Sequence, residues 1–439
     1  MFSTFAGFFK NKEIRKKILF TIAILFVYRM GAQIPVPNVS LDITQVSETK
    51  SILDMMNLLG GGAMDKLSIF ALGVGPYITA SIIIQLLSMD VIPHLTELSK
   101  SGQTGKKKLD KYTRYLAVVL CFVQAYTTTL VLTRQDGSSI LENSSTAGFL
   151  YVAIVFTAGT MFLLWLADRI SMHGIGNGVS IIIFAGIVSD MPYQFINAFR
   201  TLTAGANGSS FFSGVLTFVG FVLVYLIIIV LVIFMQTAVR KIPIQYTSST
   251  VQKSGKDMTY LPLKINSASV IPVIFASSIM IAPVTIVSLL VNNNIIKASG
   301  WTETMQNLLG MQSATSLVIY AILIVLFTFF YTKLQVDPEK ISDNLSKSGT
   351  YIPGIRPGKE TKNYINTVLS RITVLGAIGL LFIALLPNVA PLIMPSLPSS
   401  IRMGGTGLII VVGVAMETVA QLKGQMTAKS YRGFMGVKR

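Results

Sequence analysis

The sequence has little charge and almost no cysteine. Only 13% of its 439 residues are charged whereas 52% are hydrophobic, which excludes a soluble globular protein and a disordered chain. The single cysteine, Cys121, lies in an apolar stretch, so an intramolecular disulfide bond is also excluded. A cleavable signal peptide is not expected, because the first apolar stretch runs into Ile-Pro-Val-Pro at 34–37 rather than a small-residue cleavage site. The composition therefore predicts an integral membrane protein.

Ten apolar stretches are candidates to cross about 30 Å of hydrocarbon. They are expected at residues 18–34, 74–89, 115–133, 149–167, 175–192, 211–235, 269–291, 314–332, 372–392 and 403–422. The second and fifth are short and are interrupted by Gly or Pro. The predicted fold class is all-α, with ten transmembrane helices.

Positive charge alternates between the gaps that separate these stretches. Of the 36 Lys and Arg residues, 29 fall in alternate gaps and six in the intervening ones, while Arg29 lies inside the first stretch. Cytoplasmic loops carry the excess of Lys and Arg, so both termini are expected in the cytoplasm. The net charge of +17 is typical of such loops, and a docking surface for a large acidic partner is the other interpretation.

Two pairs of stretches share sequence at the same offset. Residues 76–83 and 272–279 are identical at five of eight positions, and a Gly-x-Gly precedes an Ile-Ile pair at both 176–178 and 405–407. Both pairs are five stretches apart. A unit with an odd number of spans is inverted in its second copy, so the sequence predicts two inverted five-span halves.

The middles of the duplicated stretches lack carboxylates and carry Ile, Val, Ser, Thr and Gly. Interrupted spans at matching places in inverted halves indicate a pathway near the membrane midplane. A secondary transporter would need an ionisable residue there, but Glu417 and Arg29 lie toward span ends. An apolar constriction that opens fits these residues better, with a transporter as the alternative.

An intramembrane enzyme is the second alternative. It would need a nucleophile with a base, or paired carboxylates, within the bilayer. His94 and His173 both lie in connections, with no Ser partner in a span, and the Gly-x-Gly pairs are not followed by Gly-Lys-Ser/Thr. We expect no catalytic residue, no metal and no cofactor.

Three further features have both a structural and a functional interpretation. Residues 52–66 form a Met-rich amphipathic segment with three consecutive glycines, which is either an ordinary external loop or a mobile element that folds into the mouth of the pathway. Polar side chains inside spans, at Thr79, Gln124, Ser277 and Ser278, either hydrogen-bond between helices or form a seam that can part. Gly354 and two prolines hold Arg356 on a stiff loop tip, suited to contact carboxylates or phosphates.

The chain closely resembles the SecY family, the large subunit of the bacterial protein-conducting channel, in strings from the first span to the tenth. These strings lie at 68–73, 76–78, 80–87, 174–178, 180–188, 271–272, 274–278, 347–349, 352–358 and 404–406. The resemblance implies an hourglass channel of two five-span halves. Its apolar pore ring would comprise Val74, Ile78, Val179, Ile183, Ile274 and Ile410, where the family pattern is mostly Ile.

The resemblance also assigns roles to the features above. The plug region that covers the ring would be the segment 52–66, with Ile52, Met55, Met56, Leu58, Gly60, Gly61 and Gly62. Thr79, Gln124, Ser277 and Ser278 would line a lateral gate toward lipid. Arg240, Lys241 and Arg356 would dock the SecA motor or the ribosome.

The implied function is a passive channel of the cytoplasmic membrane, with ATP hydrolysed by SecA. It would pass secretory proteins across and release membrane spans sideways. Expected partners are SecE, SecG, SecA, the ribosome, signal peptides, nascent membrane proteins and lipids, with no direct DNA binding. The expected divisions are a cytoplasmic segment at 1–17, a first half at 18–192, an external linker at 193–210, a second half at 211–425 with cytoplasmic loops 238–268 and 333–371, and a tail at 426–439.

Overall fold

The computed structural model describes most of the chain as packed helices. The described residues are 11–37, 39, 60–64, 66–89, 91–134, 146–203, 209–246, 259–292, 300–309, 313–393 and 400–434. A helix lies across each of the ten predicted stretches: α2 (Lys12–Gly31), α4 (Gly75–Leu87), α6 (Gly102–Arg134), α7 (Thr146–His173), α8 (Gly178–Thr203), α9 (Ser209–Thr237), α10 (Ile271–Asn292), α12 (Ala314–Gln335), α14 (Lys359–Ile393) and α15 (Ser400–Phe434). Shorter helices are α5 (Pro93–Lys100), α11 (Gly300–Leu309) and α13 (Pro338–Lys347).

Local sequence explains where several helices begin. The side chain of Asn11 accepts a hydrogen bond from the backbone N–H of Glu13 at 3.1 Å, and Ser313 caps α12 in the same way. A proline occupies the first turn of α4, α5 and α13, where its missing N–H costs nothing.

Six helices in the described part of the chain are long and apolar enough to cross a membrane: α7, α8, α9, α12, α14 and α15. Helices α4 and α10 are counted among the shorter apolar helices. Helices α6, α14 and α15 extend well past their apolar stretches, because the flanking Lys, Glu, Gln and Arg residues favour helix as well.

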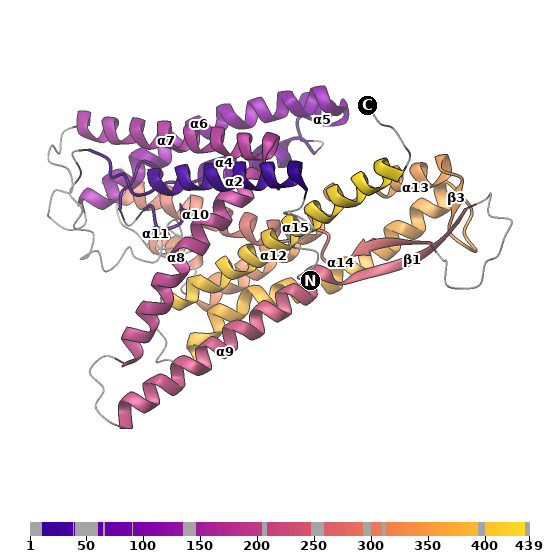
Figure 1. Cartoon of the computed structure of the whole chain (residues 1–439). Helices are drawn as coiled ribbons and strands as arrows, with labels where there is room; N and C mark the ends of the chain where they lie inside the picture. The colour runs from indigo at the N-terminus through magenta and orange to yellow at the C-terminus, as the bar shows by residue number, and fades with distance from the viewer. Residues whose placement is uncertain are drawn as a thin grey trace.

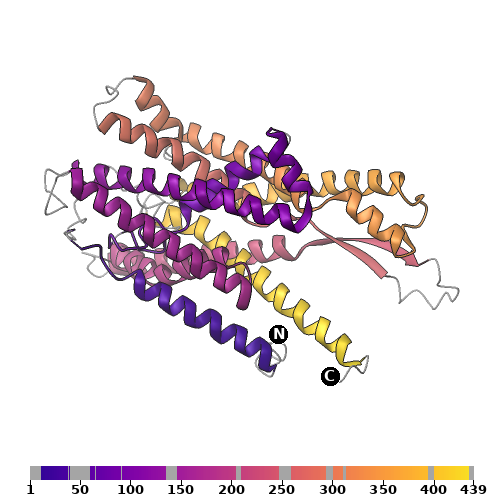
Figure 2. The same cartoon turned by 90° about the horizontal axis from the view of Figure 1, so that it is seen from above.

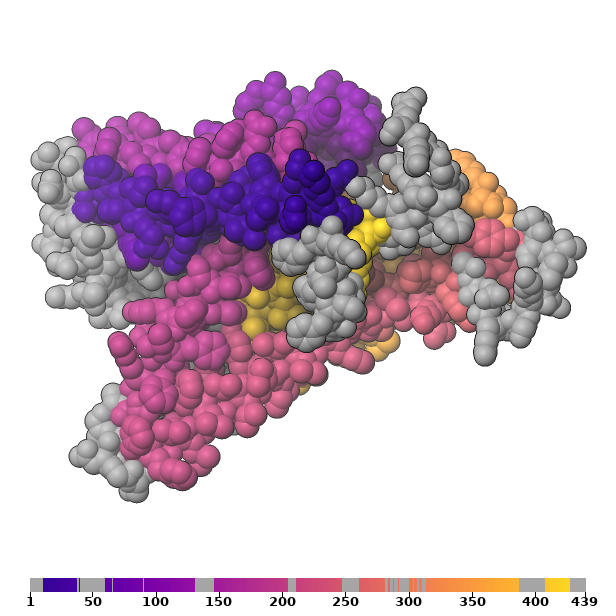
Figure 3. Space-filling view, viewed as in Figure 1, coloured from indigo at the N-terminus to yellow at the C-terminus, as the bar shows by residue number. Residues whose placement is uncertain are grey.

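The fifth stretch also continues beyond its predicted end. The predicted stretch ends at Pro192, but α8 runs through this proline to Thr203. A proline inside a helix removes one backbone hydrogen bond. The helix continues because its next turns pack on α9, where Phe195 meets Phe221 and Tyr225. Figure 3 shows α8 and α9 leaving the body of the molecule together.

The helices of each duplicated pair pack directly against each other. Helix α4 contacts α10, and α8 contacts α15. Both contacts belong to one apolar core that also includes residues of α2, α7, α9, α12 and α14. Figure 2 shows the first part of α15 between the other helices, with its C-terminal half extending beyond them.

The two long basic connections fold together into one small subdomain, although we predicted them only as loops. Strand β1 (Val239–Tyr246) pairs antiparallel with β2 (Thr259–Lys264) and with the short β3 (Thr350–Tyr351), in the order β2-β1-β3. Ile242 and Leu263 of this sheet pack on Leu345, Ile352 and Ile365. In Figure 1, β1, β3, α13 and α5 lie at one end of the helices, and α11 lies toward the other.

Candidate functional site

The six predicted ring residues lie in one apolar cluster. Five of them are at most 8% exposed, and the half-buried Val179 packs against the same cluster. The set comes from four helices: Val74 and Ile78 from the start of α4, Val179 and Ile183 from α8, Ile274 from α10, and Ile410 from α15. These are the two pairs of helices that carry the duplicated sequence. Residues four apart on α4 and on α8 lie on one helix face, so each of these helices presents two side chains.

The predicted gate residues lie on helices that pack together, since α10 contacts both α4 and α6. Thr79 on α4 bonds to the carbonyl of Gly75 at 3.3 Å, and Gln124 on α6 is half-buried. Ser278 on α10 is buried, and its hydroxyl has no hydrogen-bond partner among the described residues. Such an unpartnered hydroxyl weakens a helix contact relative to an apolar side chain.

Ser277 has a different setting from its neighbour. Its hydroxyl donates to the carbonyl of Val273 at 2.9 Å and lies 3.4 Å from the hydroxyl of Tyr320 on α12. This contact joins α10 to α12, which is not one of the helices that carry the other predicted gate residues.

The plug prediction falls largely outside the described residues, because Ile52, Met55, Met56 and Leu58 are not among them. The three glycines are described. Gly60 and Gly61 are buried, and Gly61 and Gly62 adopt positive φ of 66° and 78°, which glycine accepts without strain. Ala63 follows them and is fully buried in the same core cluster as the ring.

Two of the predicted docking residues lie next to each other on β1. Arg240 pairs with Leu263 and Lys241 with Pro262 of β2, and both side chains are exposed. Neighbouring residues of a strand point to opposite faces, so these two cations reach different sides of the hairpin. The sequence contains only a weak signal for this strand, since Ile242 and Ile244 alternate with Lys241, Pro243 and Gln245 and a proline is unfavourable inside a strand.

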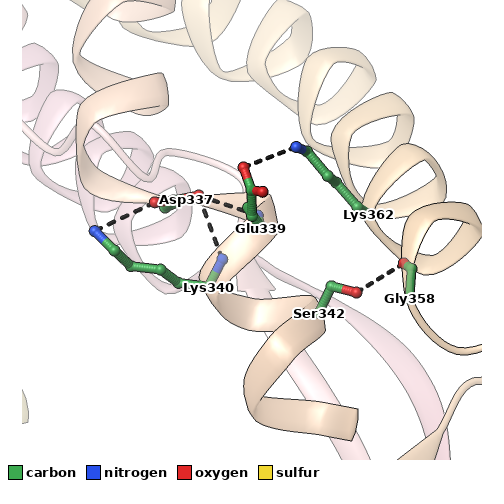
Figure 4. A network of polar contacts seen from close by, with 6 residues as sticks. All are labelled: Asp337, Glu339, Lys340, Ser342, Gly358 and Lys362. Atoms are coloured by element: carbon green, nitrogen blue, oxygen red, sulfur yellow. Dashed lines mark hydrogen bonds and ion pairs between the residues drawn. The ribbon is translucent and has the colours of Figure 1, made fainter.

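Arg356 is exposed on a loop whose base is fastened by side chains. Thr361 donates to the carbonyl of Arg356 at 2.8 Å, and Ser342 of α13 donates to the carbonyl of Gly358 at 2.9 Å. Figure 4 shows Ser342 and Gly358 beside an ion pair in which Lys362 of α14 meets Glu339 of α13 at 2.8 Å. The loop is also tied to the sheet, because Tyr351 donates to the side chain of Gln245 at 3.1 Å. These bonds support the predicted stiff loop tip.

The ion pairs of this subdomain shift two pKa values. Burial alone would raise the pKa of the Asp337 carboxyl, but hydrogen bonds from the Lys340 side chain and from the backbone N–H groups of Lys340 and Glu339 outweigh it and lower the pKa. The hydrogen bond to Glu339 raises the pKa of Lys362 above its ordinary value. The Asp337 charge therefore stabilises the start of α13 near neutral pH, and the Lys362 charge stabilises the contact of α13 with α14.

A groove of about 350 Å³ lies between α2 and α7, lined by Phe20, Ile24, Trp165, Leu166, Arg169 and His173. The guanidinium of Arg169 stacks over the Trp165 ring at 5.1 Å. Nowhere in the described residues do three or more His, Cys, Asp or Glu side chains gather as metal ligands would.

Comparison with known proteins gives a consistent assignment. The SecY family model matches residues 68–419. Over 440 residues the chain is 44% identical to protein translocase subunit SecY of Staphylococcus carnosus (strain TM300), covering 99% of this chain and 100% of that one. It is 45% identical over 437 residues to protein translocase subunit SecY of Bacillus subtilis (strain 168), with the same coverage.

Solved structures with the same fold are protein-conducting channels. One, described as "The structure of a protein conducting channel", superposes with a TM-score of 0.65 at 18% identity, covering 94% of this chain and 92% of that one. Two others have the same coverage: a SecY structure whose plug domain is described as stabilising the closed channel, at a TM-score of 0.65 and 19% identity, and canine Sec61 in a ribosome-channel complex, at 0.61 and 17%. The extent of the match to the family model and the identity to full-length relatives show that this chain belongs to the SecY family.

Proposed function

We propose that this chain is the channel through which unfolded secretory proteins cross the cytoplasmic membrane. The observation that carries the proposal is the convergence of six Ile and Val residues from two duplicated pairs of helices in one apolar cluster. An apolar neck resists wetting and blocks ions, whereas an extended polypeptide can displace the side chains. The chain itself hydrolyses nothing, and a partner supplies the energy.

The architecture that fits this function is an hourglass of ten spans in two inverted halves, at 18–192 and 211–425. The contacts of α4 with α10 and of α8 with α15 support it, because helices related by a two-fold axis in the membrane plane can meet each other at that axis. The burial of the ring residues then corresponds to a closed channel. The termini would lie in the cytoplasm, as the Lys and Arg distribution predicts.

Lateral release of membrane spans would use the contact of α10 with α4 and α6. Thr79, Gln124 and Ser278 make this contact less apolar than a Leu or Ile seam, so less energy is needed to separate the helices. Ser277 would act from the other side of α10, through its contact with Tyr320. A signal sequence or nascent span that is more apolar than this seam would insert there.

The basic subdomain would receive the motor or the ribosome. Arg240, Lys241 and Arg356 are exposed at the end of the molecule that carries β1, β3 and α13. Solved structures with the same fold include canine Sec61 in a ribosome-channel complex and the yeast Ssh1 complex bound to a ribosome, which supports a ribosome as a partner of this chain. SecA would bind to the same loops, and SecE and SecG would cover apolar faces that the described residues leave exposed, such as those of α9.

The function is tested by protease protection of a preprotein. Liposomes that contain the chain with SecE and SecG are incubated with preprotein, SecA and ATP, and we expect full-length protected preprotein only when ATP is present. Arg356→Glu should abolish protection while the protein still inserts and folds, because it reverses the charge at the docking tip.

Lys347→Glu is the matched control, since Lys347 is an exposed cation in the same connection but lies at the end of α13. Equal loss in both variants would show a general charge effect rather than a contact of Arg356. Absence of protection with the unaltered chain, when SecA and the partners are active with a known channel, would contradict the function itself.

A further inference from the structure

Arg29 is a cation inside an apolar span. It belongs neither to the apolar ring nor to the docking residues. It lies in the last turn of α2, next to the buried Tyr28. Its guanidinium Nη1 donates to the carbonyl of Gly61 at 2.9 Å, and the Tyr28 hydroxyl donates to the carbonyl of Gly60 at 3.2 Å. Two adjacent side chains of α2 therefore hold two adjacent carbonyls of the glycine segment.

Helix α8 holds the same segment from another side. Gly61 packs on Gly186 so closely that a Cβ added to Gly61 would lie 2.3 Å from the Gly186 Cα. A Cβ on Gly186 would lie 3.0 Å from the Tyr28 hydroxyl, and one on Gly62 would lie 3.4 Å from the Asp190 carboxylate. Only glycine at 61 and 186 allows the backbones to approach this far.

The contacts of Gly60 and Gly61 with α2 and α8 lie next to the apolar ring. Gly186 follows the ring residue Ile183 by three positions, which is about 4.5 Å along α8 at 1.5 Å per residue. Ala63, two residues after Gly61, is fully buried among the same core residues as Ile183. Movement of the glycine segment would therefore change the packing beside the neck.

Movement of residues 60–62 out of this position costs free energy. The carbonyls of Gly60 and Gly61 would lose their donors, and a guanidinium at the edge of an apolar span would lose an acceptor. A hydrogen bond to a charged group contributes more than a neutral one, so Arg29 should contribute the larger part and Tyr28 the smaller. The other role open to Arg29 is a favourable interaction with the C-terminal end of the α2 dipole.

We propose that Tyr28, Arg29 and Gly186 form a latch that holds residues 60–62 in place beside the apolar ring. The inference rests on the proposed channel function only for its consequence, which is control of the seal. The latch itself is a set of contacts that can be tested without transport.

The experiment uses the position of Ala63. In a Cys121→Ser background, Ala63→Cys places one buried thiol beside the latch, and a water-soluble maleimide is added to the chain with its small partners in nanodiscs. We expect Tyr28→Phe to speed labelling several-fold, and Tyr28→Phe with Arg29→Gln to speed it by roughly tenfold or more, because each lost hydrogen bond raises the population of the released segment.

Matched controls make the same kinds of substitution at residues outside the latch. Tyr225→Phe removes a hydroxyl from a tyrosine of α9, and Arg200→Gln removes an exposed cation from the last turn of α8. Both should leave the labelling rate unchanged. Tyr28→Phe also keeps the charge of Arg29 at the end of α2. Faster labelling in this variant would therefore show that the interaction of Arg29 with the helix dipole does not by itself hold the glycine segment in place.

Unchanged labelling in the Tyr28 and Arg29 variants, when they insert and assemble like the unaltered chain, would overturn the latch. Ion leak through the same proteins in liposomes then separates the two claims. Faster labelling with a higher leak supports both latch and channel. Faster labelling without any leak keeps the latch and contradicts its control of a channel seal.

Discussion

At the scale of single residues, the proposed seal depends on apolar side chains that are buried in this structure. Ile183 is 2% exposed and belongs to the core shared by α4, α8, α10 and α15. Burying an Ile side chain is worth about 1.5–3 kcal/mol, which a hydroxyl of smaller size does not recover. Each residue of the proposed ring would therefore contribute to the barrier against water.

Ile183→Ser should raise the ion leak of the resting channel. Removing about 2 kcal/mol of apolar burial corresponds to an increase of more than tenfold in a rate that depends on wetting of the neck. The leak is measured as ion efflux from liposomes that contain the chain and its small partners. Val188→Ser, at a more exposed position of the same helix, serves as the control and should leave the leak unchanged. Equal leak in both variants would remove Ile183 from the ring.

The six ring residues come from the family resemblance, and the structure places them in one apolar cluster, while their role as a ring stays a prediction. The contacts of Tyr28 and Arg29 could not be predicted. They join residues 32 positions apart through side-chain hydrogen bonds to backbone carbonyls, and such bonds leave no periodic pattern in the sequence. From the sequence, Arg29 could be recognised only as a cation inside an apolar stretch.

At the scale of elements, α13 depends on its first residues. The Asp337 carboxylate accepts from the backbone N–H groups of Glu339 and Lys340 at 3.0 and 3.4 Å and pairs with the Lys340 ammonium at 3.3 Å. Figure 4 shows the same turn in contact with Lys362 of α14. The cap therefore fixes the start of the helix whose Glu339 and Ser342 contact Lys362 and Gly358 at the base of the loop that carries Arg356.

Asp337→Ala should destabilise α13 by about 1 kcal/mol, as loss of an N-cap usually does. The folded state lowers the pKa of Asp337, so its contribution is fully present above the ordinary carboxyl pKa of about 4 and is lost as pH falls through the lowered value. Amide hydrogen exchange over residues 338–347 at several pH values measures both effects.

Asp337→Asn is the control for the charge, because it keeps the cap and removes the ionisation. In this variant, the protection of residues 338–347 from hydrogen exchange should be lower than in the unaltered chain at neutral pH and equal to it in strong acid. A difference between the two proteins that does not change with pH would contradict an ionised cap.

The interiors of the helices were predictable from apolar runs, but their ends were not. The apolar run marks what a bilayer would cover, whereas helix propensity and capping decide where the helix stops, so α14 begins 13 residues before its predicted span. The sheet of β1, β2 and β3 was not predicted because β3 has only two residues. Its Tyr351 pairs with Gln245, 106 positions earlier, and a local sequence pattern does not show a pairing over such a distance.

At the scale of the whole molecule, the segments that carry most of the positive charge gather at one end. The gaps that hold 29 of the 36 Lys and Arg residues include those next to α5, β1 and α13, which lie together in Figure 1, whereas α11 lies toward the opposite end. A membrane that runs between these ends would separate a basic face from a nearly neutral one. The arrangement of the helices and the charge rule therefore make the same prediction for orientation.

Single cysteines test that orientation. In a Cys121→Ser background, Lys16→Cys near the start of α2 and Ser348→Cys after α13 occupy exposed positions at the basic end, and Trp301→Cys is exposed on α11. In intact cells an impermeant maleimide should label only Trp301→Cys, and in inverted vesicles only the other two, because the reagent cannot cross the bilayer. Labelling of Lys16→Cys and Trp301→Cys from the same side would contradict the ten-span arrangement, since an odd number of spans lies between them. Labelling of all three from the reverse sides would keep the ten spans and show that positive charge does not set the orientation of this chain.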